Sequence, residues 1–246
     1  MEDLQVTTLS APPARSGLTI AWDTLCAPKT AFTALQIHAS WVYAFAIVVV
    51  LGTLGSFLQV PAGEHVVTAA FAHSAATDPN LAAMSPAKQK QALGFALLAQ
   101  RYAWLAYPVI AIVGMLLSAF VLTIANAVGG GRASFGRLFA LVANIGIINY
   151  GLASLLVGLL VLRLGGDAFT TTRDIVSLLP SLARFAPEHA PKLAMALAAI
   201  NPFYVWAFVL EVFGMRIVSN VALSVAAFAA FVAVFGSSVI AVFFAK

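Results

Sequence analysis

The stretch 103–127, AWLAYPVIAIVGMLLSAFVLTIANA, contains no charged residue. A helix needs about 20 mainly apolar residues to cross the hydrocarbon core of a bilayer, and its backbone must be hydrogen-bonded internally there. Its first residues include Trp104 and Tyr107, of the kind enriched at membrane surfaces. The stretch therefore predicts a transmembrane helix, bounded by Arg101 and Arg132.

Working outward from this stretch, the same criterion finds four further apolar segments. They lie at about 41–60, 138–162, 193–214 and 217–245. The segment 193–214 is the least regular, because Asn201, Pro202 and Glu211 interrupt it. The expected fold is an all-α, polytopic membrane helix bundle with five transmembrane helices.

The composition supports a membrane location. Of 246 residues, 62% are hydrophobic and only 9% are charged, and the mean hydropathy is +0.98. An average soluble domain carries about a quarter charged residues, so 13 basic and 9 acidic side chains could not cover a water-exposed surface of this size. The net charge of +4 is scattered without a basic run, which argues against a nucleic-acid partner. The single Cys26 excludes an internal disulfide.

The segments outside the spans divide into an arm, two loops and a turn. We expect residues 1–40 to form a polar arm and a short interfacial helix, with Phe32, Leu35 and Ile37 on its apolar side. Residues 41–246 then form one membrane domain. Long polar loops are expected at 61–101, with a helix starting at Ser85-Pro86, and at 164–192, with a helical piece at 173–185; a Gly-rich turn is expected at 128–136.

Three segments resemble the bacterial branch of the Yip (Ypt-interacting protein) domain family of five-span membrane proteins. They are APKTAFTAL at 27–35, GGGRASFGRLFALVA at 129–143 and LAAINPFYVWAFVLEVFGM at 197–215. The resemblance covers about 20–245. It implies a bacterial cytoplasmic (inner) membrane location, a cytoplasmic N-terminus, a C-terminus on the opposite side and no catalytic residues. The acidic-Leu-Tyr-Gly-Pro stretch of eukaryotic members is missing here, so a small-GTPase partner is not expected.

Charge alone does not give the orientation. If the N-terminus is cytoplasmic, five basic residues lie inside and eight outside, which is opposite to the usual excess. The short turns at 128–136 and around Arg216 nevertheless carry Arg residues, and short turns are where the rule is most reliable.

Glu211 is the only acidic residue within a predicted span. An ionisable group inside a membrane is a candidate for a proton or cation path. The alternative is that Glu211 lies near the end of its helix and reaches the headgroups, or pairs with an Arg such as Arg216.

The polar residues Asn201, Asn144 and Asn149 also fall within predicted spans. Asn201-Pro202 either breaks a helix and exposes backbone carbonyls, as in some transporters, or starts the fourth span. Asn144 and Asn149 are expected to bond between helices and to help them pack, or to line a path.

Arg132, Arg137 and Arg216 are candidate contacts for lipid headgroups, because the GGGR turn offers free backbone N–H groups beside cations. Glu64, His65, His73 and Asp78 fit no standard metal-ligand spacing. No arrangement typical of a membrane protease or lipid phosphatase is present in the sequence, so neither an enzyme, a cofactor nor a metal is expected.

These observations favour a non-enzymatic adaptor, scaffold or membrane-organising protein with lipids and a protein partner or second copy as contacts. Two alternatives remain open. One is a small transporter or channel that uses Glu211 and the intramembrane Asn residues. The other is an accessory subunit or assembly factor of a larger membrane complex.

Overall fold

The structure, a computed structural model, describes residues 15–187 and 190–244. Within these residues it is helical throughout and has no strand. The α-helices are α1 (Gly17–Cys26), α2 (Pro28–Ile37), α3 (Val42–Leu58), α4 (Val60–Thr77), α5 (Pro79–Ala82), α6 (Pro86–Tyr102), α7 (Tyr107–Val128), α8 (Phe135–Gly146), α9 (Ala153–Leu164), α10 (Thr172–Val176), α11 (Pro191–Ala198), α12 (Pro202–Ser219) and α13 (Leu223–Phe244). Shorter segments are the 3₁₀ helices η1 (Ala103–Ala106), η3 (Gly166–Ala168) and η4 (Leu182–Phe185), and the π-helix η2 (Ile147–Leu152).

Among the described residues, three continuous helical segments are long and apolar enough to cross a membrane. They are Pro86–Val128, Phe135–Leu164 and Pro202–Ser219. A fourth span results if α3 and α4, which meet at an angle of 48°, are counted as one. The all-helical architecture and the presence of several membrane-spanning helices thus agree with the sequence, whereas the structure supports three or four spans by this criterion rather than five.

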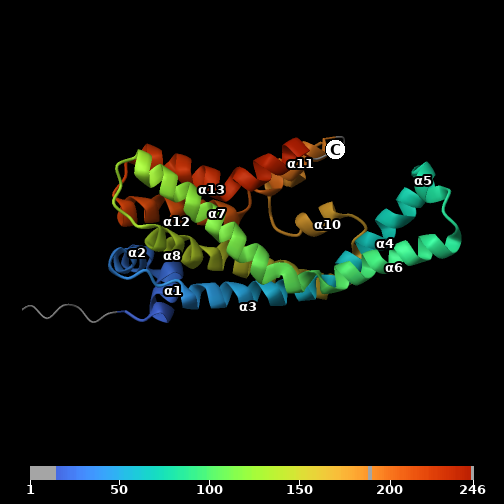
Figure 1. Cartoon of the computed structure of the whole chain (residues 1–246), viewed down its shortest axis with the longest axis horizontal. Helices are drawn as coiled ribbons and strands as arrows, with labels where there is room; N and C mark the ends of the chain where they lie inside the picture. The colour runs from blue at the N-terminus through green and yellow to red at the C-terminus, as the bar shows by residue number, and fades with distance from the viewer. Residues whose placement is uncertain (1–14, 188–189, 245–246) are drawn as a thin grey trace, which may run out of the picture.

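The bundle consists of α3, α7, α8–α9, α12 and α13, which run roughly along the long axis of the molecule (Figure 1). The helices α1 and α2 lie at one end of the bundle, and α10 and α11 lie at the other. The helices α3 and α9 pack closely together. A side chain added at Gly158 would meet the carbonyl oxygen of Gly55 at 2.5 Å, so glycine is required for these two helices to approach.

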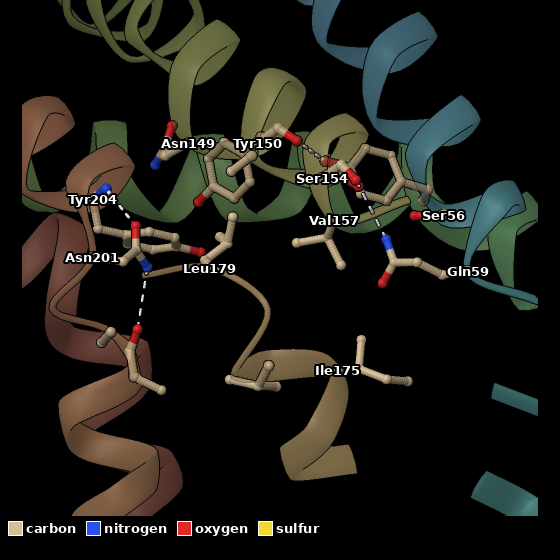
Figure 2. A pocket seen from close by; sticks show the side chains of 15 residues that line it. Ser56, Gln59, Asn149, Tyr150, Ser154, Val157, Ile175, Leu179, Asn201 and Tyr204 are labelled. Carbon is tan, nitrogen blue, oxygen red and sulfur yellow. Dashed lines mark hydrogen bonds between the residues drawn. The ribbon is translucent and has the colours of Figure 1, made fainter. Parts of the chain in front are cut away.

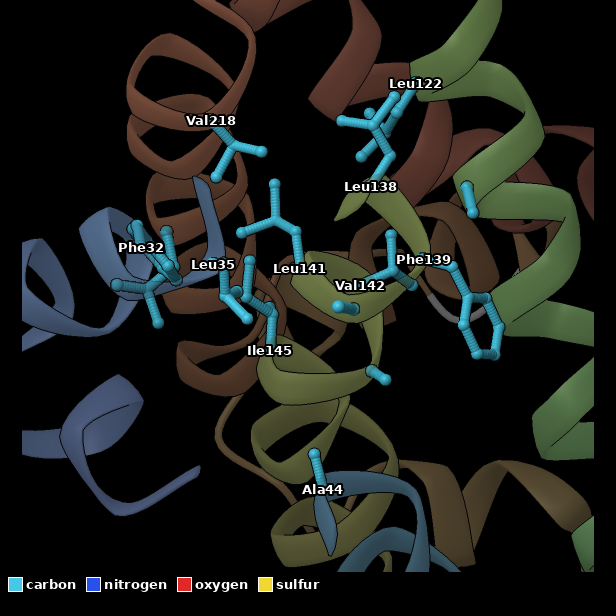
Figure 3. Close-up of a cluster of buried hydrophobic side chains, with 14 of the residues drawn as sticks. Phe32, Leu35, Ala44, Leu122, Leu138, Phe139, Leu141, Val142, Ile145 and Val218 are labelled. Carbon is cyan, nitrogen blue, oxygen red and sulfur yellow. The ribbon is translucent and has the colours of Figure 1, made fainter. Parts of the chain in front are cut away.

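The core is centred on α8, whose residues Leu138–Gly146 are all buried. Figure 3 shows Leu141 and Ile145 facing Phe32 and Leu35 of α2, with Val218 of α12 close by. A helix that is covered on every side loses the polar face of an ordinary surface helix. This explains why 138–145 contains a single polar residue, Asn144.

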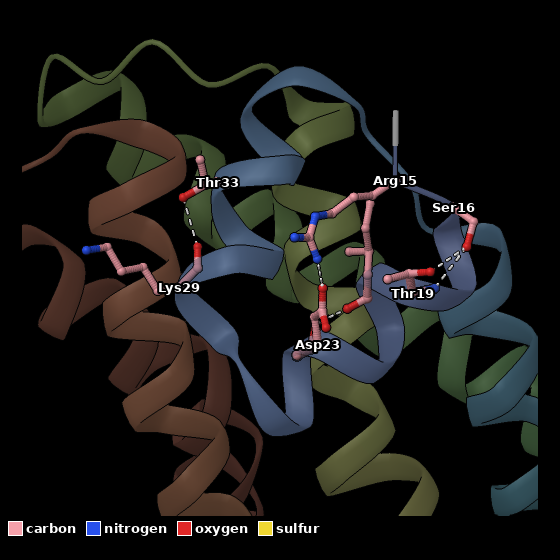
Figure 4. Close-up of polar contacts among 8 residues, drawn as sticks. Arg15, Ser16, Thr19, Asp23, Lys29 and Thr33 are labelled. Atoms are coloured by element: carbon pink, nitrogen blue, oxygen red, sulfur yellow. Dashed lines mark hydrogen bonds and ion pairs between the residues drawn. The ribbon is translucent and has the colours of Figure 1, made fainter. Parts of the chain in front are cut away.

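Residues 15–37 form two packed helices rather than one interfacial helix. Arg15 pairs with Asp23, and the Ser16 hydroxyl accepts a hydrogen bond from the Thr19 backbone N–H at 3.1 Å, which caps α1 (Figure 4). Phe32 and Leu35, expected at the membrane surface, are instead fully buried in the bundle, while Ile37 is exposed. The cause is α12, which covers the apolar side of α2 through an edge-to-face contact of Phe213 with Phe32.

The prediction of a loop at 61–101 is wrong. After Gln59 the chain continues from α3 directly into α4, and α6 runs through η1 into α7. The helices α4 and α6 therefore form a hairpin that extends beyond the bundle (Figure 1). The polar residues suggested a loop, but this segment is rich in Ala and other strong helix formers. The helix predicted to start at Ser85-Pro86 does begin at Pro86.

The fourth predicted span, 193–214, is also corrected. It is divided into α11 and α12 at Asn201, and α12 continues to Ser219. Asn220 has a φ of 56° and ends that helix in a left-handed conformation, which Asn tolerates better than most residues. The last helix consequently begins at Leu223 instead of 217.

Candidate functional site

A cavity of about 470 Å³ lies where η2 and α9 meet α3, α7, α12 and the 175–201 segment (Figure 2). More than half of its lining residues are polar, and all of these are uncharged. The polar lining residues are Ser56, Gln59, Tyr107, Asn149, Tyr150, Ser154, Asn201 and Tyr204. This cavity brings polar side chains from several helices together and is therefore a candidate binding site.

One wall of the cavity is formed by the helical segment Phe135–Leu164, which is irregular. The π-helix Ile147–Leu152 interrupts an otherwise α-helical segment, and its wider turn carries Asn149 and Tyr150. The Tyr107 hydroxyl donates a hydrogen bond to the Tyr150 carbonyl at 2.6 Å. Single π-turns within α-helices occur frequently at functional sites. Sequence reasoning located Asn149 but found no signal for the π-turn or for Tyr107.

Asn201 forms the opposite wall and acts as a helix cap. Its Oδ1 accepts hydrogen bonds from the backbone N–H groups of Phe203 and Tyr204, each at 3.1 Å. Its Nδ2 donates to the Ala198 carbonyl at 3.2 Å. With Pro202 in the first turn of α12, Asn201-Pro202 is the start of a helix, one of the two interpretations considered above. The cap directs Tyr204 toward the cavity (Figure 2).

Glu211 lies in the middle of α12, is 3% exposed, and faces the bundle interior. The expectation that it reaches the headgroups or pairs with Arg216 is wrong, because Arg216 is exposed in the last turn of α12. Among the described residues, the ion pairs are Arg15–Asp23 and Arg101–Glu64, and neither includes Glu211. The cause is packing: α8 and η2 cover the side of α12 that carries the acid.

Four buried side-chain oxygens lack a hydrogen-bond partner in the part of the chain that the structure describes. They are Thr53 Oγ1, Asn144 Oδ1, Asn149 Oδ1 and Glu211 Oε2. Asn144 donates from its Nδ2 to the carbonyls of Ser40, at 2.9 Å, and Ala140, at 2.7 Å, and so links α8 to the segment before α3. Within the described residues, neither Asn149 nor Glu211 makes a side-chain hydrogen bond, which leaves them as polar groups with capacity for a further contact.

The three Arg residues expected to contact lipid lie at the end of the bundle opposite the cavity. Arg132 belongs to the α7–α8 turn, Arg137 to the first turn of α8 and Arg216 to the last turn of α12. The side chains of Arg132 and Arg216 are exposed and that of Arg137 is half-buried. The turn is held by Asn126, whose Nδ2 donates to the Ala133 carbonyl at 3.1 Å.

The residues with metal-capable atoms at 64–78 are spread along α4 and its end. Glu64 pairs with Arg101 at 2.8 Å, and His65 Nδ1 lies 3.1 Å from the Phe169 carbonyl. His73 lies two turns further along α4, and Asp78 caps α5. The structure thus places these residues at the base and tip of the hairpin, away from the cavity lining.

The chain matches no protein-family model, no curated protein and no solved structure.

Proposed function

We propose that this protein is a non-enzymatic, Yip-like membrane adaptor that contacts a protein partner through its α4–α6 hairpin. The observation that carries this proposal is that the hairpin extends beyond the bundle and that few of its residues are fully buried. In α6 no residue is buried, and in α4 only Ala62 and Gly63 are. Helices with so few fully buried residues leave an exposed surface to which another molecule can bind.

The hairpin is held at its base by contacts between its two helices and with η3. Arg101 of α6 pairs with Glu64 of α4, the α4 helix packs against η3, and His65 Nδ1 lies 3.1 Å from the carbonyl of Phe169, the residue after η3. A side chain added at Gly63 would collide with Gln100, so the helices are in close contact there. A hairpin held in this way presents a defined surface, which lowers the entropic cost of binding.

One face of α6 is apolar. Phe95, Leu98 and Tyr102 are 64%, 53% and 53% exposed, and their spacing places them along one stripe of the helix. Such a stripe is the kind of surface that packs against an apolar groove or helix of a partner. We propose a membrane-protein partner, because this stripe continues into the exposed apolar residues Leu105 and Val109.

We propose five spans: α3, α7, α8–α9, α12 and α13. The helix α13 has 22 residues, and a helix of this length extends about 33 Å, enough to cross a bilayer. The proposed N-terminus is cytoplasmic, as in Yip domain proteins, and the membrane is the bacterial inner membrane. This choice places the turns with Arg132 and Arg216 inside and the hairpin outside.

The single cysteine allows the orientation to be tested directly. Cys26 is exposed at the end of α1, and the tip of the hairpin includes Ala83. A membrane-impermeant maleimide added to spheroplasts should leave the native chain unlabelled and should label Ala83→Cys in a Cys26→Ser background. Labelling of Cys26 from outside would reverse the proposed orientation. In the proposed topology one span, α3, separates Cys26 from Ala83. Labelling of both positions from the same side would therefore contradict this topology.

The adaptor proposal is tested by photo-crosslinking in native membranes. A benzophenone amino acid replaces Phe95 on the hairpin or, as a matched control, Phe120, an exposed residue on α7. We expect a discrete protein adduct from position 95 and lipid adducts from position 120. A stoichiometric adduct would identify the chain as a subunit of a larger complex. No protein adduct from position 95, or the same adduct from both positions, would overturn the proposal.

A further inference from the structure

A second hollow in the structure is a groove of about 520 Å³ between the neighbouring helices α7 and α13. It shares no lining residue with the polar cavity. Its lining residues are apolar except for Ser224, which lies in the first turn of α13 at one end of the groove. The groove therefore has an apolar length and one polar end, which is the pattern that fits an amphiphile.

The shape of the groove favours a lipid chain over another helix. Its lining includes the small residues Ala125, which is half-buried, and Ala229, which is buried. Ile124, Val128 and Phe228 line it as well and are 51%, 83% and 71% exposed. Membrane helices associate through small residues that let their backbones approach. The bulky exposed side chains would keep a second helix at a distance, whereas a flexible acyl chain fits between them.

The polar end of the groove adjoins the turn between α7 and α8. A Cβ added at Gly129 would lie 2.9 Å from Cγ1 of Val225, the residue after Ser224. The Arg132 backbone N–H donates to the Ser219 carbonyl at 3.2 Å. The turn therefore packs against the residues that end α12 and begin α13, and it brings Arg132 to the same end of the bundle as the polar end of the groove.

Arg132 gives this end of the groove a positive charge. Its side chain is exposed, and the ion pairs in the described part of the chain do not include it. Neither α7, α13 nor the turn at 129–134 contains an Asp or Glu that would offset the charge. Basic residues at a membrane surface attract anionic headgroups, so the charge at this end is complementary to an anionic lipid.

The prediction that this turn offers free backbone N–H groups is wrong. The N–H groups of residues 129–132 donate to backbone carbonyls, among them those of Ala125 and Asn126 at 2.8 and 2.7 Å. A phosphate at this end would therefore be bound by side chains. The Arg132 guanidinium and the Ser224 hydroxyl are suited to this, because both residues are exposed and both groups donate hydrogen bonds.

We propose that the groove and Arg132 together bind one phospholipid with a net negative headgroup. An acyl chain lies between α7 and α13, and the phosphate lies at Arg132. The turn joins two helical segments that are long and apolar enough to cross a membrane, Pro86–Val128 and Phe135–Leu164, so it lies at the level of the headgroups. The volume of about 520 Å³ is in the range of small-molecule sites.

The lipid site rests on the proposed placement of α13 in the membrane, but it is independent of the hairpin, since no lining residue belongs to α4 or α6. Absence of a protein adduct from the hairpin would leave the lipid site intact. Conversely, absence of lipid binding would leave the adaptor role intact.

The test is native mass spectrometry of the purified full chain in detergent, titrated with phosphatidylglycerol or with phosphatidylcholine of identical acyl chains. We expect one phosphatidylglycerol to bind per chain, and phosphatidylcholine to bind at least about fivefold more weakly. Equal binding of the two lipids would overturn the proposal. A dimer that excludes the lipid would also overturn it, because the groove would then belong to a second copy.

Variants separate the headgroup contact from the groove. Arg132→Gln should weaken phosphatidylglycerol binding by about fivefold. Its control, Arg173→Gln, removes an exposed Arg from α10 at the other end of the bundle and should leave the affinity unchanged. Val121→Trp, which fills the groove without changing a charge, should weaken binding at least as much. Its control is Val113→Trp, on α7 outside the groove.

The exposed position of Arg132 covers the case in which Val121→Trp does not fold. Unchanged binding in a folded Arg132→Gln or Val121→Trp protein, or an equal loss in a variant and its control, would refute the site.

Discussion

The core helix α8 and the hairpin helix α6 differ both in sequence and in surroundings. All nine residues of α8 from Leu138 to Gly146 are buried, whereas α6, which is longer, buries none. The difference arises from neighbours: α8 is covered by α2, α3, α7 and α12, while α6 packs against α4 and η1. Stability should therefore depend on the α8 region, and the hairpin is free to serve contacts with other molecules.

The largest expected contrast compares two phenylalanines. Phe32 is fully buried against α8 and α12, and Phe95 is 64% exposed on α6. Phe32→Ala should lower the free energy of unfolding by about 3–5 kcal/mol, because it leaves a cavity in the core. Phe95→Ala should change it by less than about 0.5 kcal/mol. Equal losses in denaturation measured in detergent would contradict the division between the two ends.

A second contrast compares two glycines. An added Cβ at Gly158 would meet the Gly55 carbonyl oxygen at 2.5 Å, whereas nothing lies within 4 Å of one at Gly94. Gly158→Ala should destabilise the bundle by about 1–3 kcal/mol through overpacking of α3 and α9. Gly94→Ala should leave stability unchanged or raise it by up to about 1 kcal/mol, since Ala favours the helix. Thermal unfolding of both variants checks the signs.

A third contrast compares two amides. Asn144 donates to the Ser40 and Ala140 carbonyls in the core, and Gln89 donates to the Leu81 carbonyl at the hairpin tip at 2.9 Å. Asn144→Ala should cost about 1 kcal/mol, because the Ser40 carbonyl loses its partner inside the protein. Gln89→Ala should cost less, since water can replace the bond. The comparison fails if Gln89→Ala is the more destabilising variant.

The smallest expected effect concerns Asp174, at the start of α10. Burial acts to raise the pKa of this carboxyl, but hydrogen bonds from the Thr170 and Thr171 backbone N–H groups and hydroxyls outweigh it, so the pKa is lower than usual. A group with a depressed folded-state pKa stabilises the fold above its unfolded pKa, and this contribution is lost as the pH falls through the folded value.

Acidification should therefore loosen the first turn of α10 and lower the hydrogen-exchange protection of the Thr170 and Thr171 amides, after correction for intrinsic rates. Asp174→Asn should remove this pH dependence. Protection that falls equally in the variant would assign the effect to another group.

The positions of the apolar residues along the chain determined much of this fold. The stretches around 103–127 and 138–162 are helical because a chain in lipid must satisfy its backbone internally, and both form parts of long helices here. Neighbouring residues also predicted helix starts at Pro86 and Pro202, because Pro suits the first turn of a helix and Asn201 is a good cap. Helices begin at both positions in the structure. These features depend on neighbouring residues and can be derived from the sequence alone.

Other features depend on contacts between distant residues. The sequence predicted a loop at 61–101 because a polar helix without partners cannot be distinguished from a loop by hydropathy, whereas the structure pairs α4 with α6. The sequence singled out Glu211 as the only acidic residue within a predicted span, and left open whether it lies inside the membrane or near a helix end. Only the packing of α8 and η2 on α12 decided that its carboxyl is buried, because these elements come together only in the folded bundle.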